Sequence, residues 1–309
     1  MAEKISYAIL GRGRWAARMH AILASEGRRT HAIGETRAPE SQSRESKALG
    51  AGESETSETS QAYATRPHES KAVESYALRP RASEAPESNT VRQRESETGE
   101  AYQARLSAGL RQTGAQIAWL CVPPGPHIFS MARAALEAGL HVVIEKPWLG
   151  SRDESASLIA FAQERRLRIG IHYEYCLLDA VANWRRDLRD GANFRFGGRF
   201  HTGRANHLNL PALENLGSHL LAIRAYAVPK ASIAEIDCAY ERSNERRVWL
   251  ENAGEHRRSI DFLENREPII QRFVKLFESA LNGSDFPFDL HFAQRVADDV
   301  NALKNLRTL

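Results

Sequence analysis

Cysteine is scarce in this sequence, and its placement excludes whole classes of site. The chain has three cysteines, Cys121, Cys176 and Cys238, which are far apart and odd in number. They form no CxxC pair, so we expect neither a disulfide framework nor a zinc site built from cysteine. This cysteine usage fits a reducing compartment, and we predict a cytoplasmic protein.

The sequence also lacks long hydrophobic runs and an excess of one charge. The apolar run Ile5–Leu10 is too short for a signal peptide and is interrupted by Gly11, and no stretch approaches transmembrane length. The 42 basic residues nearly balance the 39 acidic residues, and no basic block stands alone. We therefore expect neither nucleic acid nor a membrane surface as a partner.

What is present is the composition of a soluble globular protein. The chain has 309 residues, of which 42% are hydrophobic and 26% are charged. This length is sufficient for two domains, each with a sizeable core.

A glycine-rich turn follows the first predicted strand. We expect Ile5–Leu10 to form a buried strand, and residues 11–16 then read G-x-G-x-x-A before a helical pattern begins. In a dinucleotide site Gly11 allows the tight turn, Gly13 lets the backbone approach the pyrophosphate, and Ala16 lets the helix pack on the strand. The free N–H groups at the helix start then bind phosphate. The cofactor-binding residues predicted at this turn are Gly11, Gly13, Arg14 and Trp15.

The choice between the two nicotinamide cofactors stays open. Residues 30–34 are expected to form the second strand, and Glu35 follows it about twenty residues after the glycines. An acidic residue at this place binds the ribose hydroxyls of NAD, whereas Arg37 would suit the phosphate of NADP. Glu35 is otherwise an ordinary loop carboxylate.

The segment from residue 38 to about residue 98 differs in composition from the rest. Ser, Glu, Arg, Ala and Pro dominate it, and few large apolar side chains are present to offset the entropy of ordering. We interpret it as a long insertion, poorly packed or partly helical, with Val73–Leu78 as its one plausible strand. A lid or an interaction arm is the functional alternative.

Alternating strands and helices surround this insertion and continue to residue 172. Pro123–His127 ends a continuous apolar strand, Gly139 is placed to end the next helix, and Ser151–Glu154 matches a capping box. The alternation predicts an α/β Rossmann domain with a doubly wound parallel sheet over residues 1–150. The expected strands after the insertion are Ile117–Val122, Val142–Ile144 and Leu167–His172, the last as the sixth strand.

Lys146 sits just beyond the carboxyl end of the strand Val142–Ile144. In an open α/β sheet this edge is where ligands bind. Lysine there acts as a general base if desolvation or nearby positive charge lowers the pKa of its ammonium group. The alternative is a strand end that carries a solvated Glu145–Lys146 pair.

Residues 151–309 predict a second, α+β domain that binds the substrate. Strands follow one another here instead of alternating with helices, which indicates an open antiparallel sheet. We expect the boundary near Gly150, with the sixth strand and the two closing helices packing back on the first domain. The expected strands are residues 194–201, 232–241, 246–252 and 256–264, and the expected helices are 177–188, 211–226, 268–281 and 289–303.

Five short motifs span nearly the whole chain apart from the insertion. They are Gly11-Arg-Gly13, Pro123-Pro-Gly-Pro-His127, Glu145-Lys-Pro147, Gly170-Ile-His-Tyr-Glu-Tyr175 and Gly217-Ser-His219. Together they resemble the glucose–fructose oxidoreductase, inositol dehydrogenase and rhizopine-catabolism (Gfo/Idh/MocA) family, and Glu-Lys-Pro at this place in the order is the most specific of them.

The resemblance implies NAD or NADP as cofactor and a sugar- or polyol-like substrate held on the second sheet. In similar proteins the Lys of Glu-Lys-Pro and the later His take part in proton transfer at the oxidised hydroxyl, which assigns these roles to Lys146 and His219. Assembly into a homo-oligomer through the open sheet is also implied. The further cofactor contacts implied are Pro123, His127, Glu145 and Lys146.

Three departures from the family pattern concern the same site. The family often has Asp four residues before the His, where this chain has Asn215 on the same helix face. Asn orients an imidazole or a hydroxyl but carries no charge, so we count Asn215 among the catalytic candidates. The Asp often found three residues after the His is Ala222. Instead of the Asn and Arg common after the last parallel strand, this chain has His172 and Glu174, which we expect to contact the substrate together with His219.

The alternative for His219 is a core histidine beside Leu216 and Leu220. His201, His207 and His219 match no metal-binding spacing, and we expect no metal. Two function classes therefore remain. The first is an NAD(P)-dependent dehydrogenase or reductase that acts on a secondary alcohol or carbonyl. The second is a dinucleotide-binding sensor or scaffold with altered catalysis.

Overall fold

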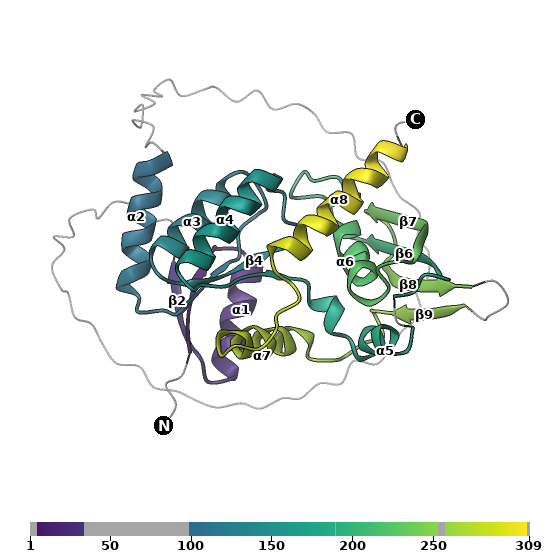
Figure 1. Ribbon diagram of the computed structural model, residues 1–309, viewed down its shortest axis with the longest axis horizontal. Coiled ribbons are helices and arrows are strands. Elements are labelled where there is room, and N and C mark those ends of the chain that lie inside the picture. Colours follow the sequence, from purple (N-terminus) through teal and green to yellow (C-terminus); the bar gives the residue numbers. More distant parts are fainter. Residues whose placement is uncertain (1–4, 34–98, 189, 253–256, 308–309) are drawn as a thin grey trace, which may run out of the picture. The chain divides into compact units, whose positions relative to one another are not determined.

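The computed structural model describes residues 5–33, 99–188, 190–252 and 257–307, and its first half is a parallel sheet (Figure 1). The sheet has five strands in the order β2-β1-β3-β4-β5. Each neighbouring pair is parallel, which confirms the doubly wound fold. The strands are β1 (Ser6–Leu10), β2 (Arg29–Ile33), β3 (Ile117–Leu120), β4 (His141–Glu145) and β5 (Ile169–His172).

The burial of each strand follows from its place in the sheet. β1 and β3 are completely buried, as expected for apolar runs covered on both faces, whereas the edge strand β2 is partly exposed. The chain leaves β1 outward to β2 and returns to β3 on the other side of β1. The strand order therefore reverses between β1 and β3, and the crevice beyond their carboxyl ends is the expected place for a ligand.

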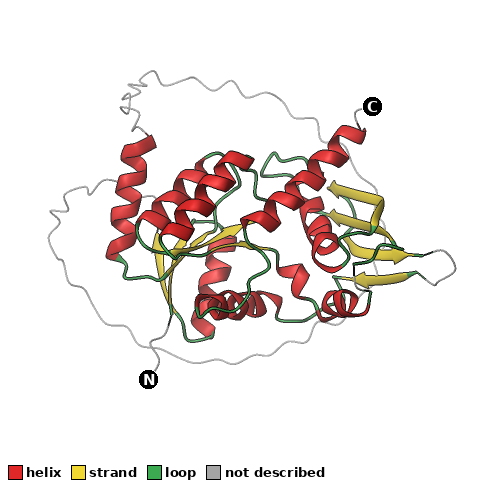
Figure 2. Ribbon diagram, in the orientation of Figure 1, coloured by secondary structure: helices red, strands yellow, loops and turns green. Residues whose placement is uncertain are grey.

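Helices lie on both faces of this sheet (Figure 2). Two local predictions are confirmed: Gly139 has a φ of +84° after α3, and Ser151 and Glu154 form the capping box that begins α4. The helices are α1 (Arg14–Ser25), α2 (Gly99–Gln112), α3 (His127–Glu137) and α4 (Arg152–Glu164).

One group of predictions falls outside the described residues. It comprises the insertion 38–98 with its candidate strand Val73–Leu78, and the two residues Glu35 and Arg37. Within the described part of the chain, Leu167–His172 therefore supplies the fifth strand of the sheet, not the sixth.

The second sheet has four strands in the order β7-β6-β8-β9. β6–β8 and β8–β9 are antiparallel, but β6 and β7 are parallel, so the sheet is mixed and not wholly antiparallel as expected. The chain crosses back through a helix between β6 and β7, so that β7 begins beside the start of β6 and runs in the same direction. The strands are β6 (Arg195–Thr202), β7 (Ser232–Tyr240), β8 (Glu245–Glu251) and β9 (Arg258–Asp261).

Two of the helices predicted for this half are irregular. The helix expected over residues 211–226 begins as a π-helix, η2 (Leu213–Gly217), and continues as α6 (Ser218–Ala227). The helix expected over residues 177–188 is preceded by a short 3₁₀ helix, η1 (Glu174–Leu177), and becomes α5 (Asp179–Asp187). π-helical turns occur frequently at functional sites.

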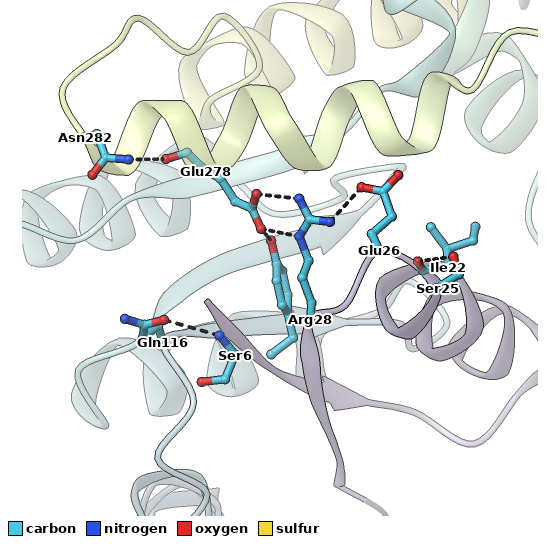
Figure 3. A network of polar contacts seen from close by, with 9 residues as sticks. Ser6, Ile22, Ser25, Glu26, Arg28, Gln116, Glu278 and Asn282 are labelled. Atoms are coloured by element: carbon cyan, nitrogen blue, oxygen red, sulfur yellow. Dashed lines mark hydrogen bonds and ion pairs between the residues drawn. The ribbon is translucent and has the colours of Figure 1, made fainter. Parts of the chain in front are cut away.

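The closing helices α7 (Ile269–Leu281) and α8 (Leu290–Arg307) return to the first sheet. Glu278 of α7 accepts two hydrogen bonds from Arg28, at 2.6 and 2.7 Å (Figure 3). It also accepts one from the Tyr7 hydroxyl at 2.7 Å. The backbone N–H of Ile171 in β5 donates to the carbonyl of Phe288 before α8. A domain boundary near Gly150 stays a prediction.

Candidate active site

Lys146 is joined to the second half of the chain by the nitrogen of its side chain. Its Nζ donates to the side-chain Oδ1 and to the backbone carbonyl of Asn215, each at 3.0 Å. The Nδ2 of Asn215 in turn donates to the Tyr240 hydroxyl at 2.8 Å. The end of β4, the π-helix and the end of β7 therefore meet at this lysine.

The environment of Lys146 favours the neutral amine. Burial lowers the pKa of Lys146, and the charge of Arg246 acts in the same direction, while Glu174 and Glu145 partly oppose them. The lysine is thus a largely desolvated group, and the alternative of a solvated Glu145–Lys146 pair does not describe it. A lowered ammonium pKa is the property that a lysine general base needs.

Glu145 and His172 form the floor of the site on adjacent strands. The register of β4 and β5 places them side by side, and the Nδ1 of His172 lies 3.2 Å from Oε1 of Glu145. The indole N–H of Trp119 in β3 donates to the same oxygen at 2.8 Å. Burial alone would raise the pKa of Glu145, but the charge and hydrogen bond of His172, with the bond from Trp119, hold it below its usual value.

His172 also lies near a second carboxylate, that of Glu174. Oε2 of Glu174 lies 4.0 Å from Nδ1 of His172. Burial lowers the pKa of His172, but the charges of Glu145 and Glu174 outweigh it and the net shift is upward. Burial raises the pKa of Glu174, which favours its protonated form.

His219 is a buried histidine whose hydrogen-bonding capacity is not met. Its ring stacks on Phe200 with centroids 5.3 Å apart and meets the edge of Tyr175 at 4.8 Å. Burial lowers its pKa well below the ordinary value, and the charges of Lys146 and His172 add to that effect, so the imidazole is neutral. The structure thus agrees with the core-histidine alternative about burial, but Nδ1 has no hydrogen-bond partner among the described residues.

Other unpartnered polar atoms belong to the same group of residues. Nε2 of His172, Oε2 of Glu174 and Nε of Arg246 are buried without a hydrogen-bond partner in the described part of the chain. Buried polar atoms without partners are costly and uncommon in proteins. Together with Nδ1 of His219, these atoms make the surroundings of Lys146 the candidate site for a ligand.

Sequence reasoning missed four members of this site, namely Trp119, Tyr175, Tyr240 and Arg246. For Arg246 a signal was present, because residues 246, 248 and 250 share one face of the predicted strand and the other two are apolar. For the remaining three nothing in the local sequence separates a site residue from a core aromatic.

The glycine turn has the geometry that a dinucleotide requires. Gly11 has a φ of +139°, and a Cβ there would lie 2.3 Å from the carbonyl oxygen of Cys121, so glycine is required for β1 and β3 to end this close together. Gly13 is the N-cap of α1 without a side-chain cap, and a Cβ there would meet nothing within 4 Å. The space beside Gly13 and the uncapped helix start fit a pyrophosphate.

The other predicted cofactor residues divide into two places. Arg14 begins α1, while Pro123 and His127 follow β3, and all three are exposed or partly exposed around the crevice. Trp15 turns towards Lys146's neighbours, with its ring centroid 6.0 Å from that of His172. Trp15 therefore connects the glycine turn to the charged cluster of Glu145, His172 and Glu174.

No group of three or more His, Cys, Asp or Glu side chains arranged to hold a metal ion was found in the described ranges. None of the described helices is long and apolar enough to cross a membrane.

A glycine turn at the switch point of a parallel sheet, with a desolvated lysine at the end of β4, defines a Rossmann-type dinucleotide-binding protein. The sequence profile of the oxidoreductase family with an NAD-binding Rossmann fold, Gfo/Idh/MocA, matches residues 5–173, more than half of the chain. The chain belongs to this family. Over 65 residues, 21% of this chain and 16% of the relative, it is 34% identical to YfiI, an uncharacterised oxidoreductase of Bacillus subtilis (strain 168).

Solved structures share the fold along nearly the whole chain. UDP-N-acetylglucosamine 3-dehydrogenase GnnA from Acidithiobacillus ferrooxidans is 14% identical, with a TM-score of 0.64 over 97% of this chain and 96% of that one. WlbA dehydrogenase from Bordetella pertussis, in complex with NADH and UDP-GlcNAcA, is 14% identical, with a TM-score of 0.60 over 98% and 96%. GenD2 from gentamicin A biosynthesis, in complex with NAD, is 13% identical, with a TM-score of 0.62 over 98% and 93%.

Proposed function

We propose that this protein is an NAD(P)-dependent oxidoreductase that moves a hydride between nicotinamide and a secondary alcohol or carbonyl carbon of a sugar- or polyol-like molecule. The observation that carries the proposal is Lys146. Its amine is desolvated, oriented by the two hydrogen bonds that it donates to Asn215, and placed at the ligand-binding edge of a Rossmann sheet.

The residues around the crevice have separate tasks in this proposal. Gly11 allows the tight turn and Gly13 gives room to the pyrophosphate, with Arg14, Trp15, Pro123 and His127 beside them. Glu35 or Arg37 would select the cofactor from outside the described residues. Bound nicotinamide supplies the hydride chemistry.

The proton of the reacting hydroxyl goes to Lys146. The neutral Nζ accepts it when the alcohol is oxidised, and the resulting ammonium returns it when the carbonyl is reduced. Asn215 fixes the direction of Nζ with Oδ1 and the backbone carbonyl. His219, neutral and with a free Nδ1, orients the substrate, and His172 and Glu174 contribute further polar contacts to it.

The structural relatives widen the substrate class that is worth testing. GnnA is named for its action on UDP-N-acetylglucosamine, and WlbA was crystallised with UDP-GlcNAcA. Sugar nucleotides therefore join free sugars and polyols as candidates. Assembly through the second sheet and a cytoplasmic location stay predictions.

The direct test is cofactor binding followed by turnover. Quenching of protein fluorescence on titration with NADH and NADPH measures binding, and absorbance of the reduced nicotinamide measures turnover with sugars, polyols and sugar nucleotides. We expect at least one of the two reduced cofactors to bind, and its oxidised form to be reduced by a member of the panel. Tight cofactor binding without turnover of any member would favour the sensor or scaffold, for which the uncharged Asn215 is the motivating observation.

A further inference from the structure

Arg246 places a positive charge on the inner face of the second sheet. Side chains alternate along β8, and Arg246 shares a face with Val248 and Leu250, both completely buried. Its partner across the antiparallel pair is Phe200 of β6, which is also buried. Arg246 itself is half-buried, and a charge that is partly removed from water is costly unless something neutralises it.

No carboxylate of the described residues neutralises Arg246. Its guanidinium lies over the ring of Phe200, 4.9 Å from the centroid, and Nη1 donates to the Tyr175 hydroxyl at 3.4 Å. Its Nε is buried without a hydrogen-bond partner in the described ranges. Nε of Arg247, the next residue on the opposite face, is also buried without a partner in those ranges, but its Nη2 forms an ion pair with Glu245 at 2.7 Å.

Arg246 belongs to the site of Lys146 and His219. The guanidinium of Arg246 lies over Phe200, and the ring of Phe200 stacks on His219. Tyr175, which accepts a hydrogen bond from Arg246, packs against the same imidazole in a T-shaped arrangement. The charge of Arg246 lowers the pKa of Lys146 and of His219, which requires that all three lie close together. The guanidinium, without a carboxylate partner among the described residues, therefore lies within electrostatic range of the amine that would handle the reacting proton.

We propose that Arg246 binds an anionic group of the substrate, a carboxylate or a phosphate, so that the substrate is an acidic sugar and not a neutral polyol. This inference rests on the proposed oxidoreductase function. A guanidinium offers two parallel N–H donors to a carboxylate or phosphate, and such charge-assisted pairs are among the strongest hydrogen bonds in proteins. The Tyr175 hydroxyl and Nδ1 of His219 are placed to contact the rest of the same molecule.

Glu174 is the side chain that would oppose an anion. Burial raises its pKa, and its Oε2 lies 4.0 Å from Nδ1 of His172. A protonated Glu174 carries no charge and donates a hydrogen bond instead of repelling the ligand. With Glu174 protonated, Glu145 is the remaining carboxylate of this cluster, and it already lies at hydrogen-bond distance from His172.

The test is calorimetric titration of the protein loaded with its reduced cofactor. Three probes of similar size are compared: glucose, glucuronate for the carboxylate and glucose 1-phosphate for the phosphate. We expect one or both anions to bind at least about tenfold more tightly than glucose. The anion that binds identifies the charged group.

Variants at two neighbouring arginines assign the effect. Arg246→Gln should remove the preference for the anion, and Arg247→Gln, on the opposite face of β8, should retain it. Arg246→Lys keeps the charge and should retain part of the preference even if Arg246→Gln folds poorly, which thermal unfolding and cofactor titration would show. Equal binding of glucose and both anions, no binding of any probe, or an anion preference that survives in Arg246→Gln would overturn the inference.

Turnover separates this inference from the proposed function. Anion binding that depends on Arg246, without cofactor oxidation or reduction by any panel member, would support the anion site and contradict the oxidoreductase function. Turnover of neutral sugars that is unchanged in Arg246→Gln would support the oxidoreductase function and contradict the anion site.

Discussion

Lys146 donates to two oxygens of one residue, Oδ1 and the backbone carbonyl of Asn215, and both distances are 3.0 Å. An amide orients an amine as well as a carboxylate does, but it does not stabilise the ammonium form by charge. Asn215 therefore leaves Lys146 with the low pKa that burial produces. The aspartate common at this place in the family would counteract that shift.

Asn215→Asp should raise the pKa of Lys146. A carboxylate at hydrogen-bond distance favours the protonated lysine, so the neutral base forms only at higher pH. In the direction of alcohol oxidation, the limb of the pH–rate profile on which turnover rises with pH should move to higher pH. Asn282→Asp, which adds the same charge at the exposed end of α7, is the control and should leave the limb in place. If the limb stays in place in Asn215→Asp, it does not report the titration of Lys146.

Lys146→Met should keep cofactor binding and lose turnover. Methionine replaces the stem by a similar apolar length but accepts no proton. A general base contributes roughly two to four orders of magnitude in rate, so we expect a fall of about a hundredfold or more and the loss of the rising limb. His219→Ala should cost less. Turnover by Lys146→Met at the parental rate would show that the lysine is not the base.

Gly13→Val should weaken cofactor binding without unfolding the protein. A Cβ at this position meets nothing within 4 Å, so the fold has room for it, but the branched side chain would occupy the space expected for the pyrophosphate. We expect an affinity loss of at least about tenfold, or about 1.4 kcal/mol, in fluorescence titration. Gly109→Ala in α2, where a Cβ also meets nothing, should bind like the parent. Unchanged titration by both cofactors would refute the assignment of the turn.

Glu35→Ala tests cofactor choice. If Glu35 accepts hydrogen bonds from the ribose hydroxyls, its removal should weaken NAD far more than NADP. The measurement is the ratio of the two dissociation constants in the variant and the parent. Equal losses for both cofactors would remove Glu35 from the site.

Glu278→Gln should destabilise the packing of α7 on the first sheet. Glu278 and Arg28 are mostly buried, with side-chain exposures of 15% and 13%, and Arg28 would lose its main counterion. We expect roughly 3 kcal/mol in the free energy of unfolding, the lower end of the range for breaking a buried pair, because Glu26 still neutralises Arg28 at 2.7 Å.

The control for this loss is an exposed ion pair of similar length. Asp298→Asn breaks the contact with Arg152 at 2.8 Å, where the side chains are 38% and 75% exposed. Its cost should be about 0–1 kcal/mol in urea unfolding at neutral pH. Equal costs for the two variants would mean that the Arg28–Glu278 pair is not the stabilising contact.

Features that depend on residues adjacent in the chain were readable from the sequence alone. The glycine turn, the left-handed Gly139 and the capping box of Ser151 and Glu154 each follow from local backbone geometry. The fully buried strands were readable too, because parallel strands covered on both faces are continuous apolar runs. Lys146 was identified in the same way, from its place just after such a run.

Tertiary structure decided the features that depend on which strands pair. The parallel pairing of β6 with β7 follows from where α6 returns the chain, and strand patterns do not encode direction. The contact of Glu145 with His172 requires β4 beside β5, and that of Lys146 with Asn215 joins residues 69 apart in the sequence. The strand pattern puts Arg246 on the same face as two apolar residues, but only the folded chain pairs it with Phe200. Burial and neighbouring charge set the chemistry of each of these side chains, and both depend on residues that only the folded chain brings together.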